Sequence, residues 1–582
     1  MSHDVLDRTV GDEMTERNVA QPQRNRRGNV AQRARRDRSS HIGLRLVGLR
    51  LLRLRALGLS AALGLGLGCA NPTSRPEAGP KDSAASDAAN GACAVDCAAT
   101  GLACSLQRCT SSACQASESN GQGVAGCIFY TLQADNVTAD ENATTSFLVA
   151  NAGLARANVT LEMAQPASGG AAWMELGEFE VEVGASRRVP IPVPGLQVTA
   201  VGVTKKAALR ISSDQPVTVS EIESDNVDSL ATSSGGTMVL PLQSLGTDHR
   251  VVTYPQEATN DVQTTAGSRG GGARVMVVAT VDQTWVTFTP VGPVTADPSG
   301  LTPNIPAHGS YQVMLDDGDV FQIYSGAPGE DLTGAEVSAT APVAVFSGNI
   351  STTYGSNVTG INSADMAHEQ MPPLSSWSKL YVAAAMTPQA SIGCTSFFGM
   401  DGASIWKVVA SRKGTLVTVA GPSIPSVTYP LDAGAVQTLV EVGNFIVTAN
   451  YPVLVTQGID CEPSLSLGLA VGATTSLTTL PFAVPPSFDL LMEIVRPNGV
   501  EIDLDGAPID GTLFQTVGSG FGVASVPLAA CIPTDGTGVC THLLVSKSTN
   551  TGAGFGMSLR GMDVGSSFAF STPLVGCDPC LN

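Results

Sequence analysis

One eleven-residue pattern occurs three times in this chain, and it constrains the fold more than any other feature. It reads LRISSDQPVTV at 209–219, AEVSATAPVAV at 335–345 and FIVTANYPVLV at 445–455. In each copy a β-rich segment leads to a polar or small turn, then to a proline and alternating apolar residues. Pro216, Pro342 and Pro452 lie 126 and 110 residues apart. Repeats of this period predict domain-sized β modules, which favours binding over catalysis.

The composition agrees with an all-β chain. At 582 residues the chain can form several domains, each with its own core. A hydrophobic fraction of 43% is too high for a disordered protein, while 62 glycines and 35 prolines indicate many turns. We therefore predict antiparallel, turn-rich β structure.

The net charge of −19 is unevenly distributed. Residues 1–68 hold 13 basic and 6 acidic side chains, so the rest of the chain carries a net charge of −26. Such an acidic body repels phosphate backbones, and this argues against nucleic-acid binding.

The basic head resembles a bacterial lipoprotein signal. Arginines precede a short apolar stretch, ALGLSAALGLGLG, which ends at Cys69. In such signals the cysteine thiol is acylated and the peptide before it is removed. The pattern departs from the usual one at Gly66, where a branched apolar residue is common, and an ordinary secretory signal cleaved nearby is the alternative. Residues 69–92, rich in Pro, Ala, Ser and Asp, predict a flexible tether.

Twelve cysteines remain when Cys69 is set aside, and in an exported protein an even number predicts disulfides. Six crowd into a segment of low apolar content at 93–127, where a zinc site is disfavoured by the lack of a nearby histidine. Cys394–Cys461 and Cys531–Cys540 are plausible pairs, and the terminal C-x2-C pair favours structural bonding. The candidates are Cys93, Cys97, Cys104, Cys109, Cys114, Cys127, Cys394, Cys461, Cys531, Cys540, Cys577 and Cys580.

Strand-like runs before each proline phrase, and a shared opening signal, divide the body into four modules. The opening signals are LPLQSLG at 240–246, MPPLSSW at 371–377 and LPFAVPP at 480–486. Each module has the size of a small β-sandwich, and the proline suits an edge or the start of a strand. A propeller-like ring of the four repeats is the alternative. The predicted divisions are the leader 1–68, the tether 69–92, the Cys-rich segment 93–127, and modules at 128–238, 239–371, 372–479 and 480–582.

Three longer segments resemble one known family. They read GCIFYTLQADN at 126–136, DLTGAEVSATAPVAVFSGN at 331–349 and HEQMPPLSSWSKLYV at 368–382. Together they are similar to the N-terminal domain family of the IgG Fc-binding protein, over roughly 127–575. The loop at 350–367 lacks the cysteine pair that this family usually has there. The resemblance implies that this chain carries a domain found in exported bacterial lipoproteins, of a type common in myxobacteria-like proteomes. We do not infer an antibody ligand for this chain from it.

His368 and Glu369 form the most suggestive pair for chemistry. A metalloprotease helix needs H-E-x-x-H, and here QMPPL follows, whose prolines exclude that helix. We therefore expect a packing role. Of the other histidines outside the leader, His249, His308 and His542 show no paired spacing.

Two further motifs have plain structural interpretations. The carboxylates of Asp316, Asp317 and Asp319 surround Gly318 without the spacing of a calcium loop, so we predict a hairpin turn. Gly267–Gly272 leads into a strand and not into a helix N-terminus, so we predict a flexible loop and not a phosphate site.

We therefore predict a lipid-anchored protein of the cell surface or outer membrane, with a secreted form as the alternative. Its expected role is binding or adhesion to an extracellular protein or matrix ligand, without catalysis, cofactor, metal or nucleic acid, and with membrane contact only through the lipid. Loops at 255–273 and 350–370 are the expected contact regions. A secreted enzyme with an unrecognised active site and a purely structural envelope protein are the alternatives.

Overall fold

The computed structural model of the chain describes most of residues 103–572. Its longest gaps are at 137–144, 224–233, 256–260, 295–303, 353–364 and 386–402. The described part is built from strands that pair almost entirely antiparallel, with one α-helix, which confirms the predicted all-β class. Within it, no helix is both long and apolar enough to cross a membrane.

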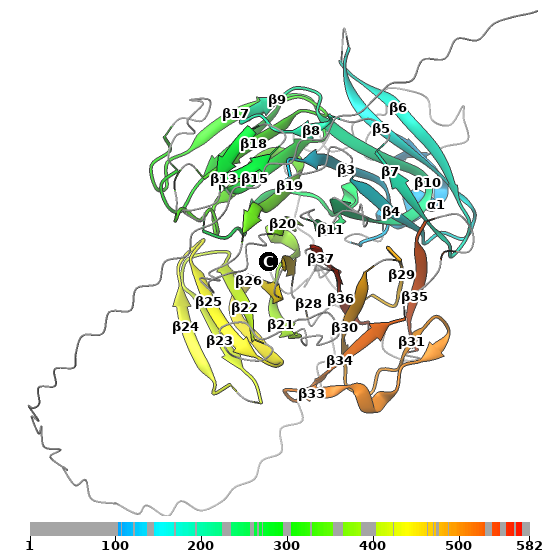
Figure 1. The fold of residues 1–582 in the computed structure, drawn as a ribbon, viewed down its shortest axis with the longest axis vertical. Coiled ribbons are helices and arrows are strands. Elements are labelled where there is room, and N and C mark those ends of the chain that lie inside the picture. The colour runs from blue at the N-terminus through cyan, green and yellow to red at the C-terminus, as the bar shows by residue number, and fades with distance from the viewer. Residues whose placement is uncertain are drawn as a thin grey trace, which may run out of the picture. The chain divides into compact units, whose positions relative to one another are not determined.

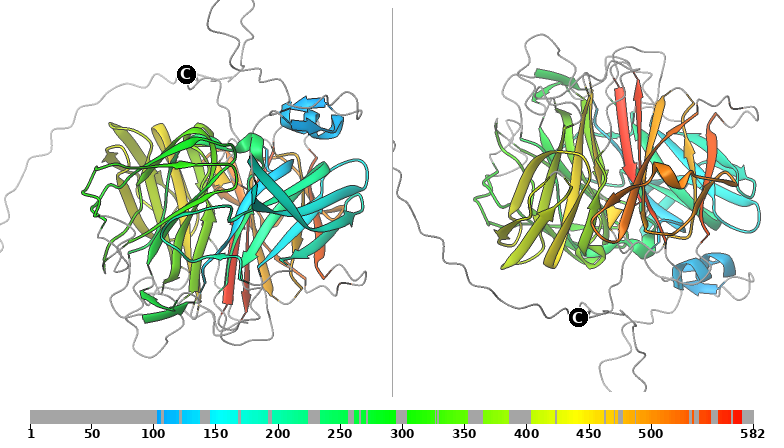
Figure 2. Two further views of the ribbon diagram at one scale, coloured as in Figure 1. Left: turned by 90° about the horizontal axis from the view of Figure 1, so that it is seen from above. Right: turned by 90° about the horizontal axis from the view of Figure 1, so that it is seen from below.

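A small Cys-rich unit precedes the first large sheet. Strands β1 (Ala103–Ser105) and β2 (Arg108–Thr110) form a hairpin, and α1 (Ser112–Ser119) follows it. A disulfide between Cys114 and Cys127 joins α1 to the start of β3. Figure 2 shows this unit, in blue, beside the cyan strands of the first sheet.

Sheet 1 is an eight-stranded sheet with the order β6-β5-β10-β3-β8, to which β4, β7 and β11 are added through β10 and β4. Only β3 and β8 pair in parallel. Its strands are β3 (Gly126–Ala134), β4 (Ser146–Asn151), β5 (Ala157–Ala167), β6 (Gly170–Val181), β7 (Ser186–Pro190), β8 (Gln197–Val198), β10 (Ala208–Glu223) and β11 (Gly235–Val239).

Sheet 2 repeats this plan with the order β17-β16-β19-β15-β18-β9, while β12 and β20 also pair with β19. A 3-10 turn, η2 (Leu242–Ser244), precedes it, and a separate hairpin joins β13 (Asp261–Thr264) to β14 (Gly267–Gly270). Its strands are β9 (Gly202–Thr204), β12 (Gly246–Arg250), β15 (Ala273–Ala279), β16 (Thr284–Thr289), β17 (Tyr311–Leu315), β18 (Val320–Tyr324), β19 (Glu336–Thr352) and β20 (Asp365–Gln370).

Sheet 3 follows the 3-10 turn η3 (Leu374–Ser376) and has the order β24-β23-β26-β21-β28, with β22, β25 and β27 added through β26 and β22. Its strands are β21 (Ser378–Ala383), β22 (Ala403–Ala410), β23 (Thr415–Ala420), β24 (Val427–Leu431), β25 (Val436–Val442), β26 (Phe445–Cys461), β27 (Ser464–Leu469) and β28 (Val471–Gly472).

The last part of the chain forms two separate sheets, which we call sheet pair 4. The orders are β29-β35-β31-β32 and β33-β34-β30-β36-β37, with η5 (Gly511–Leu513) between β32 and β33. The strands are β29 (Thr479–Val484), β30 (Asp489–Pro497), β31 (Ile502–Leu504), β32 (Ala507–Pro508), β33 (Gln515–Val517), β34 (Phe521–Leu528), β35 (Cys540–Ser546), β36 (Gly556–Asp563) and β37 (Ser566–Ser571).

The three proline phrases lie in β10, β19 and β26, which are the longest strands in the described part of the chain. In β19, residues Glu336–Ala339 pair with β16, and residues Val343–Asn349 pair with β15. Pro342 lies where the strand changes partner, and a residue without an N–H is tolerated there because no ladder bond is required. The polar residues before the proline belong to the strand, so the predicted turn was wrong.

Sheet pair 4 shows what happens where the proline is missing. The corresponding segment of the last module, THLLVSKSTNTGAGFGMSLRGM at 541–562, lacks the proline; it includes parts of β35 and β36, two separate strands that belong to different sheets of the pair. The proline phrase therefore marks the place where one strand passes from one layer of a sandwich-like module to the other.

The four units are also joined in a cycle. Four inner strands, β11, β20, β27 and β37, contact one another in the order β11–β20–β27–β37–β11. Figure 1 shows β11, β20 and β37 at the centre of the surrounding sheets. Sheets 2 and 3 share one core, and further apolar clusters join sheets 1 and 2, sheet 3 and sheet pair 4, and sheet pair 4 and sheet 1. Each module is sandwich-like, and the contacts between neighbouring modules form a closed ring, which is what the propeller-like alternative requires.

The predicted module boundaries stay a prediction, and two strands do not follow them. β9 lies in the predicted module 1 but pairs with β18 of sheet 2. Likewise β11 runs across the proposed boundary at 238/239 and pairs with β10 of sheet 1.

Candidate functional site

An apolar pocket opens between α1, sheet 1 and sheet pair 4. Its volume is about 620 Å³, and its lining contains no ionisable side chain. Leu154, Val183 and Leu543 lie at it with exposed fractions of 97%, 54% and 36%. Apolar side chains that cluster around a hollow and remain in contact with water are typical of a ligand site.

The loop that presents Leu154 is held by hydrogen bonds. Asn151 Nδ2 donates to the carbonyl oxygens of Ala155 and Val181, both at 2.9 Å, and its Oδ1 accepts from the Gly153 N–H at 2.8 Å. Short Asn and Gly residues favour this kind of turn. The backbone that carries the exposed leucine is therefore held in place before any ligand arrives, which lowers the entropy cost of binding.

The first proline phrase forms part of the pocket wall. Pro216 lines the pocket, and its carbonyl oxygen accepts a hydrogen bond from the Ala152 N–H at 3.0 Å. Ser111 Oγ donates to the carbonyl oxygen of Asp214 at 2.7 Å and so holds the start of α1 against β10. The layer change in β10 thus also shapes the candidate binding surface.

A second site is a buried polar cluster between sheets 1 and 2. Glu221 and Glu223 come from β10 and His368 comes from β20, and all three are fully buried. His368 Nε2 lies 3.4 Å from Glu221 Oε1. Burial raises the pKa of Glu221 to about 7 and that of Glu223 to about 8. Burial also lowers the pKa of His368 to about 3, with a further contribution from Arg274.

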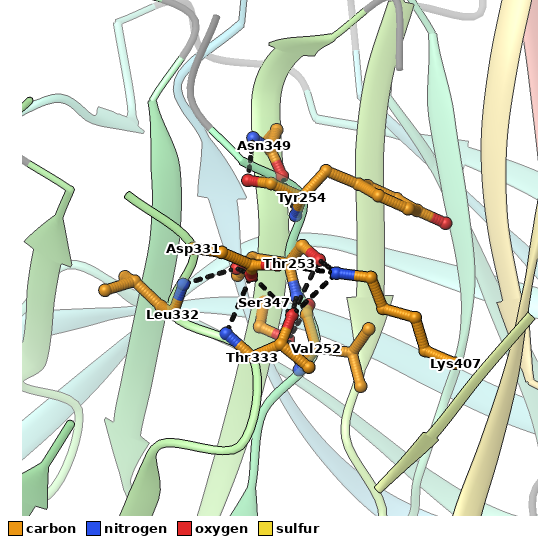
Figure 3. Close-up of polar contacts among 9 residues, drawn as sticks. All are labelled: Val252, Thr253, Tyr254, Asp331, Leu332, Thr333, Ser347, Asn349 and Lys407. Carbon is orange, nitrogen blue, oxygen red and sulfur yellow. Dashed lines mark hydrogen bonds and ion pairs between the residues drawn. The ribbon is translucent and has the colours of Figure 1, made fainter. Parts of the chain in front are cut away.

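A third polar group joins sheets 2 and 3, and Figure 3 shows its contacts. Lys407 of β22 is 3% exposed, and its Nζ donates to Asp331 Oδ2 at 2.7 Å, to the Thr253 carbonyl at 2.6 Å and to Thr333 Oγ1 at 3.0 Å. The ammonium group lies 4.9 Å from the centre of the Tyr254 ring. All three ammonium hydrogens are therefore accounted for in a buried setting.

The strand that follows DLTG completes this network. Ser347 Oγ donates to the Val252 carbonyl at 2.8 Å, and Asn349 bonds the backbone of Tyr254 through both ends of its amide, at 2.8 and 3.0 Å. DLTG and FSGN, which carried the family resemblance, thus meet in one hydrogen-bond system.

Comparison with family models matches residues 235–556 to IgGFc binding protein, which is more than half of the chain. The chain belongs to the IgGFc binding protein family. Among curated proteins, none matches it. The match to the IgGFc binding protein family begins at the first residue of β11 and ends at the first residue of β36. The wider resemblance over 127–575 stays a prediction outside this range.

The residues matched to the IgGFc binding protein family include the segments DLTG, FSGN and HEQ, which carried the resemblance in the sequence. DLTG and FSGN form the Lys407 network, and HEQ lies on the inner strand β20. Trp377 Nε1 donates to the Pro372 carbonyl at 3.1 Å, so the following proline–tryptophan motif fixes its own turn. The apolar pocket draws most of its lining from residues before 235.

Only some of the predicted disulfide cysteines lie among the described residues. Cys114 and Cys127 form a disulfide, and Cys540 is disulfide-bonded. Cys104 and Cys109 stand at directly opposite backbone positions of β1 and β2. The remaining cysteines, like the side chain of Cys461, lie outside the described residues: Cys69, Cys93, Cys97, Cys394, Cys531, Cys577 and Cys580.

The other candidate histidines do not join the cluster at His368. His249 is fully buried on β12, where burial lowers its pKa to about 3. His542 Nδ1 lies 2.8 Å from Asp505 Oδ2 in sheet pair 4. His308 lies between β16 and β17 with a φ of 59°.

The aspartate group is a turn, as predicted, but it is not a hairpin, because the flanking strands β17 and β18 do not pair with each other. Gly318 has a φ of 80° between β17 and β18. Asp319 is buried and pairs with Lys205 at 2.6 Å, and Asp317 accepts from Trp173 Nε1 at 3.0 Å. These carboxylates thus have protein partners.

The predictions that two segments form loops were partly wrong. Gly267–Gly270 forms strand β14 and pairs with β13, because its backbone groups find ladder partners there. The segment 350–370 includes the end of β19 and the whole of β20, which is an inner strand with buried side chains at 366–370. Its intervening part, 353–364, lies outside the described residues.

Sequence reasoning missed the pocket and the two glutamates. The pocket combines segments that are far apart in the chain, so no local pattern marks it. The glutamates had a usable signal: VTVSEIE ends a strand of buried residues with two carboxylates on one face, where apolar residues are expected.

Proposed function

We propose that this chain is an exported, surface-displayed protein that binds an extracellular protein ligand through the apolar pocket, in an adhesion role without catalysis. The observation that carries this proposal is the pocket with its exposed leucines and valine. The family description, a protein that binds IgG Fc, supports a protein ligand. A pocket of this volume fits one or two apolar side chains of a partner, as at the centre of many interfaces.

The lack of catalysis is part of the same proposal. The lining of the pocket has no ionisable side chain that could act as an acid, a base or a charged electrophile. His368, the most suggestive candidate, is fully buried on an inner strand and does not line this pocket.

Binding can be tested with peptides selected from a display library on the wild-type chain, with purified IgG Fc as a second probe. Leu154→Asp should weaken the selected peptides at least about tenfold, because a charge would occupy the rim of an apolar contact. Leu416→Asp is the matched control. Leu416 is also an exposed leucine, with an exposed fraction of 48%, but it lies on β23 of sheet 3. Affinities are measured by calorimetry. Equal peptide binding by wild type and Leu154→Asp would remove the pocket from the proposal.

Surface display rests on acylation of Cys69 and on the tether that follows it. Cells that express the full chain and receive radiolabelled palmitate should label the wild type, whereas Cys69→Ala should stay unlabelled. Cys114→Ala is the control, because Cys114 is in a disulfide and should leave labelling intact. A wild-type chain without label would leave a secreted protein as the remaining form.

A further inference from the structure

Three side chains converge between the inner ends of sheets 1 and 2. Glu221, Glu223 and His368 each place one ligand atom so that all three atoms lie within 4.8 Å of one another. We propose that these residues bind a divalent metal ion of the zinc class, which fastens β10 to the inner strand β20.

Strand geometry directs the two carboxylates to the same side. Residues two apart on a strand point to the same face, so Glu221 and Glu223 share a face while Ile222 points away. Ile222 packs in the cluster that sheet 1 shares with sheet pair 4. The carboxylates therefore face β20 because the intervening residue is bound to the opposite core.

The imidazole of His368 is held in a fixed plane. Its ring stacks on Phe346, with 5.4 Å between the centroids and 5° between the planes. A Cβ at Gly235 would lie 3.2 Å from the Cβ of His368, so a residue without a side chain leaves room for β20. Stacking on one face leaves the ring nitrogens pointing outward at the edge, as a metal ligand requires.

Several buried atoms of the cluster have no hydrogen-bond partner. In the described part of the chain these include both ring nitrogens of His368 and Oε1 of Glu221, although both side chains are fully buried. Leaving such atoms unpaired is costly, and native proteins do so rarely. One cation between Glu221 Oε1 and His368 Nε2 would satisfy a nitrogen and an oxygen together.

The other carboxylate oxygens are already oriented by the protein. Thr131 Oγ1 donates to Glu221 Oε2, and Thr145 Oγ1 donates to Glu223 Oε2. The Ala134 N–H donates to Glu223 Oε1 at 3.0 Å. Hydrogen bonds of this kind fix ligating carboxylates in known metal sites. Glu369 points elsewhere and accepts from Thr237 Oγ1 at 3.1 Å.

The charges leave room for a cation. Arg274 is buried nearby and acts on both Glu221 and His368, but one guanidinium balances only one of two carboxylates. A proton shared by the glutamates is the rival solution. One imidazole with two carboxylates suits zinc or manganese better than calcium, which prefers oxygen ligands alone.

The test is metal analysis of the full chain, produced with its leader in cells grown with added zinc or, separately, manganese. After dialysis, the wild type should retain about one ion per chain. X-ray absorption of the zinc form should give nitrogen and oxygen ligands at about 2.0–2.1 Å with imidazole scattering, whereas zinc in the Cys-rich segment would give sulfur at about 2.3 Å. Neither measurement needs a variant.

Variants then assign the residues. His368→Gln and Glu223→Gln should retain at least about tenfold less metal than the wild type. His249→Gln should retain the wild-type amount, because His249 is equally buried but outside the cluster. The proposal is overturned if folded wild type holds less than about a tenth of an ion per chain with both metals, if sulfur dominates the spectrum, or if His368→Gln keeps its metal.

Discussion

Replacing Lys407 by methionine is expected to lower the free energy of unfolding by about 3–5 kcal/mol. The substitution keeps the apolar stem but removes the charge that faces Asp331, whose carboxylate is 28% exposed and hydrogen-bonded inside the contact between sheets 2 and 3. The cost arises because a largely buried carboxylate is left without its cation. Urea unfolding followed by tryptophan fluorescence measures it directly, since Trp377 and Trp406 lie in the core that these sheets share.

The matched control is Lys413→Met, which removes an exposed lysine of the same sheet and should change stability by less than about 0.5 kcal/mol. Adding Asp331→Asn to Lys407→Met should restore part of the loss, because the unpaired charge is then gone. A double variant as unstable as the sum of the two single variants would show that the pair is not coupled.

The pH dependence of the same pair has a definite sign. Burial opposes ionisation of Asp331, but Lys407, Thr333 and Thr253 outweigh it and hold its pKa below the ordinary value. The stability that this carboxylate contributes is therefore complete above its unfolded-state pKa, and it is lost as the pH falls through the lowered pKa. The difference between wild type and Asp331→Asn should shrink below about pH 4.

The network at Lys407 also shows what the sequence could and could not predict. Aligning RVMVVAT of β15 with IWKVVAS of β22 places Met276 opposite Lys407. Both are strand residues that contact a preceding sheet, Met276 in the core shared with sheet 1 and Lys407 in the polar network with sheet 2. Local alternation predicts the strand in both cases. It cannot predict that Met276 packs in a cluster with leucine and tyrosine while Lys407 bonds an aspartate, because in each case the partner lies in another module.

The proline phrase illustrates the same limit. Its alternating residues predicted β structure correctly, and its period predicted repeated modules. The change of pairing partner at Pro342 was out of reach, because it depends on where β15 and β16 lie relative to β19. The pocket is a stronger case, since Pro216, Leu154 and Leu543 meet only after sheet pair 4 packs against sheet 1.

A second large effect is expected from one glycine of the DLTG motif. Gly334 has a φ of 86°, and a Cβ there would overlap the carbonyl oxygen of Gly434 in the turn between β24 and β25. Gly434 has a φ of 72°, and the Gly334 carbonyl accepts from Arg250 Nη1 at 2.9 Å. Two backbones from sheets 2 and 3 thus meet without side chains, and neither can move aside without breaking its own hydrogen bonds. Gly334→Ala should therefore cost about 3–5 kcal/mol, from the unfavourable φ and the overlap together.

Gly329→Ala separates these two contributions within the same loop. Gly329 has a φ of 84°, almost the same as Gly334, but open space surrounds the position where its Cβ would lie. This variant should lose only the conformational cost of about 1–2 kcal/mol. Urea unfolding of both variants gives the difference, which measures how closely sheets 2 and 3 must approach. Equal losses for the two alanine variants would mean that the backbones of the DLTG loop and the Gly434 turn separate easily, and that the Lys407 network and the shared core hold these sheets together without this contact.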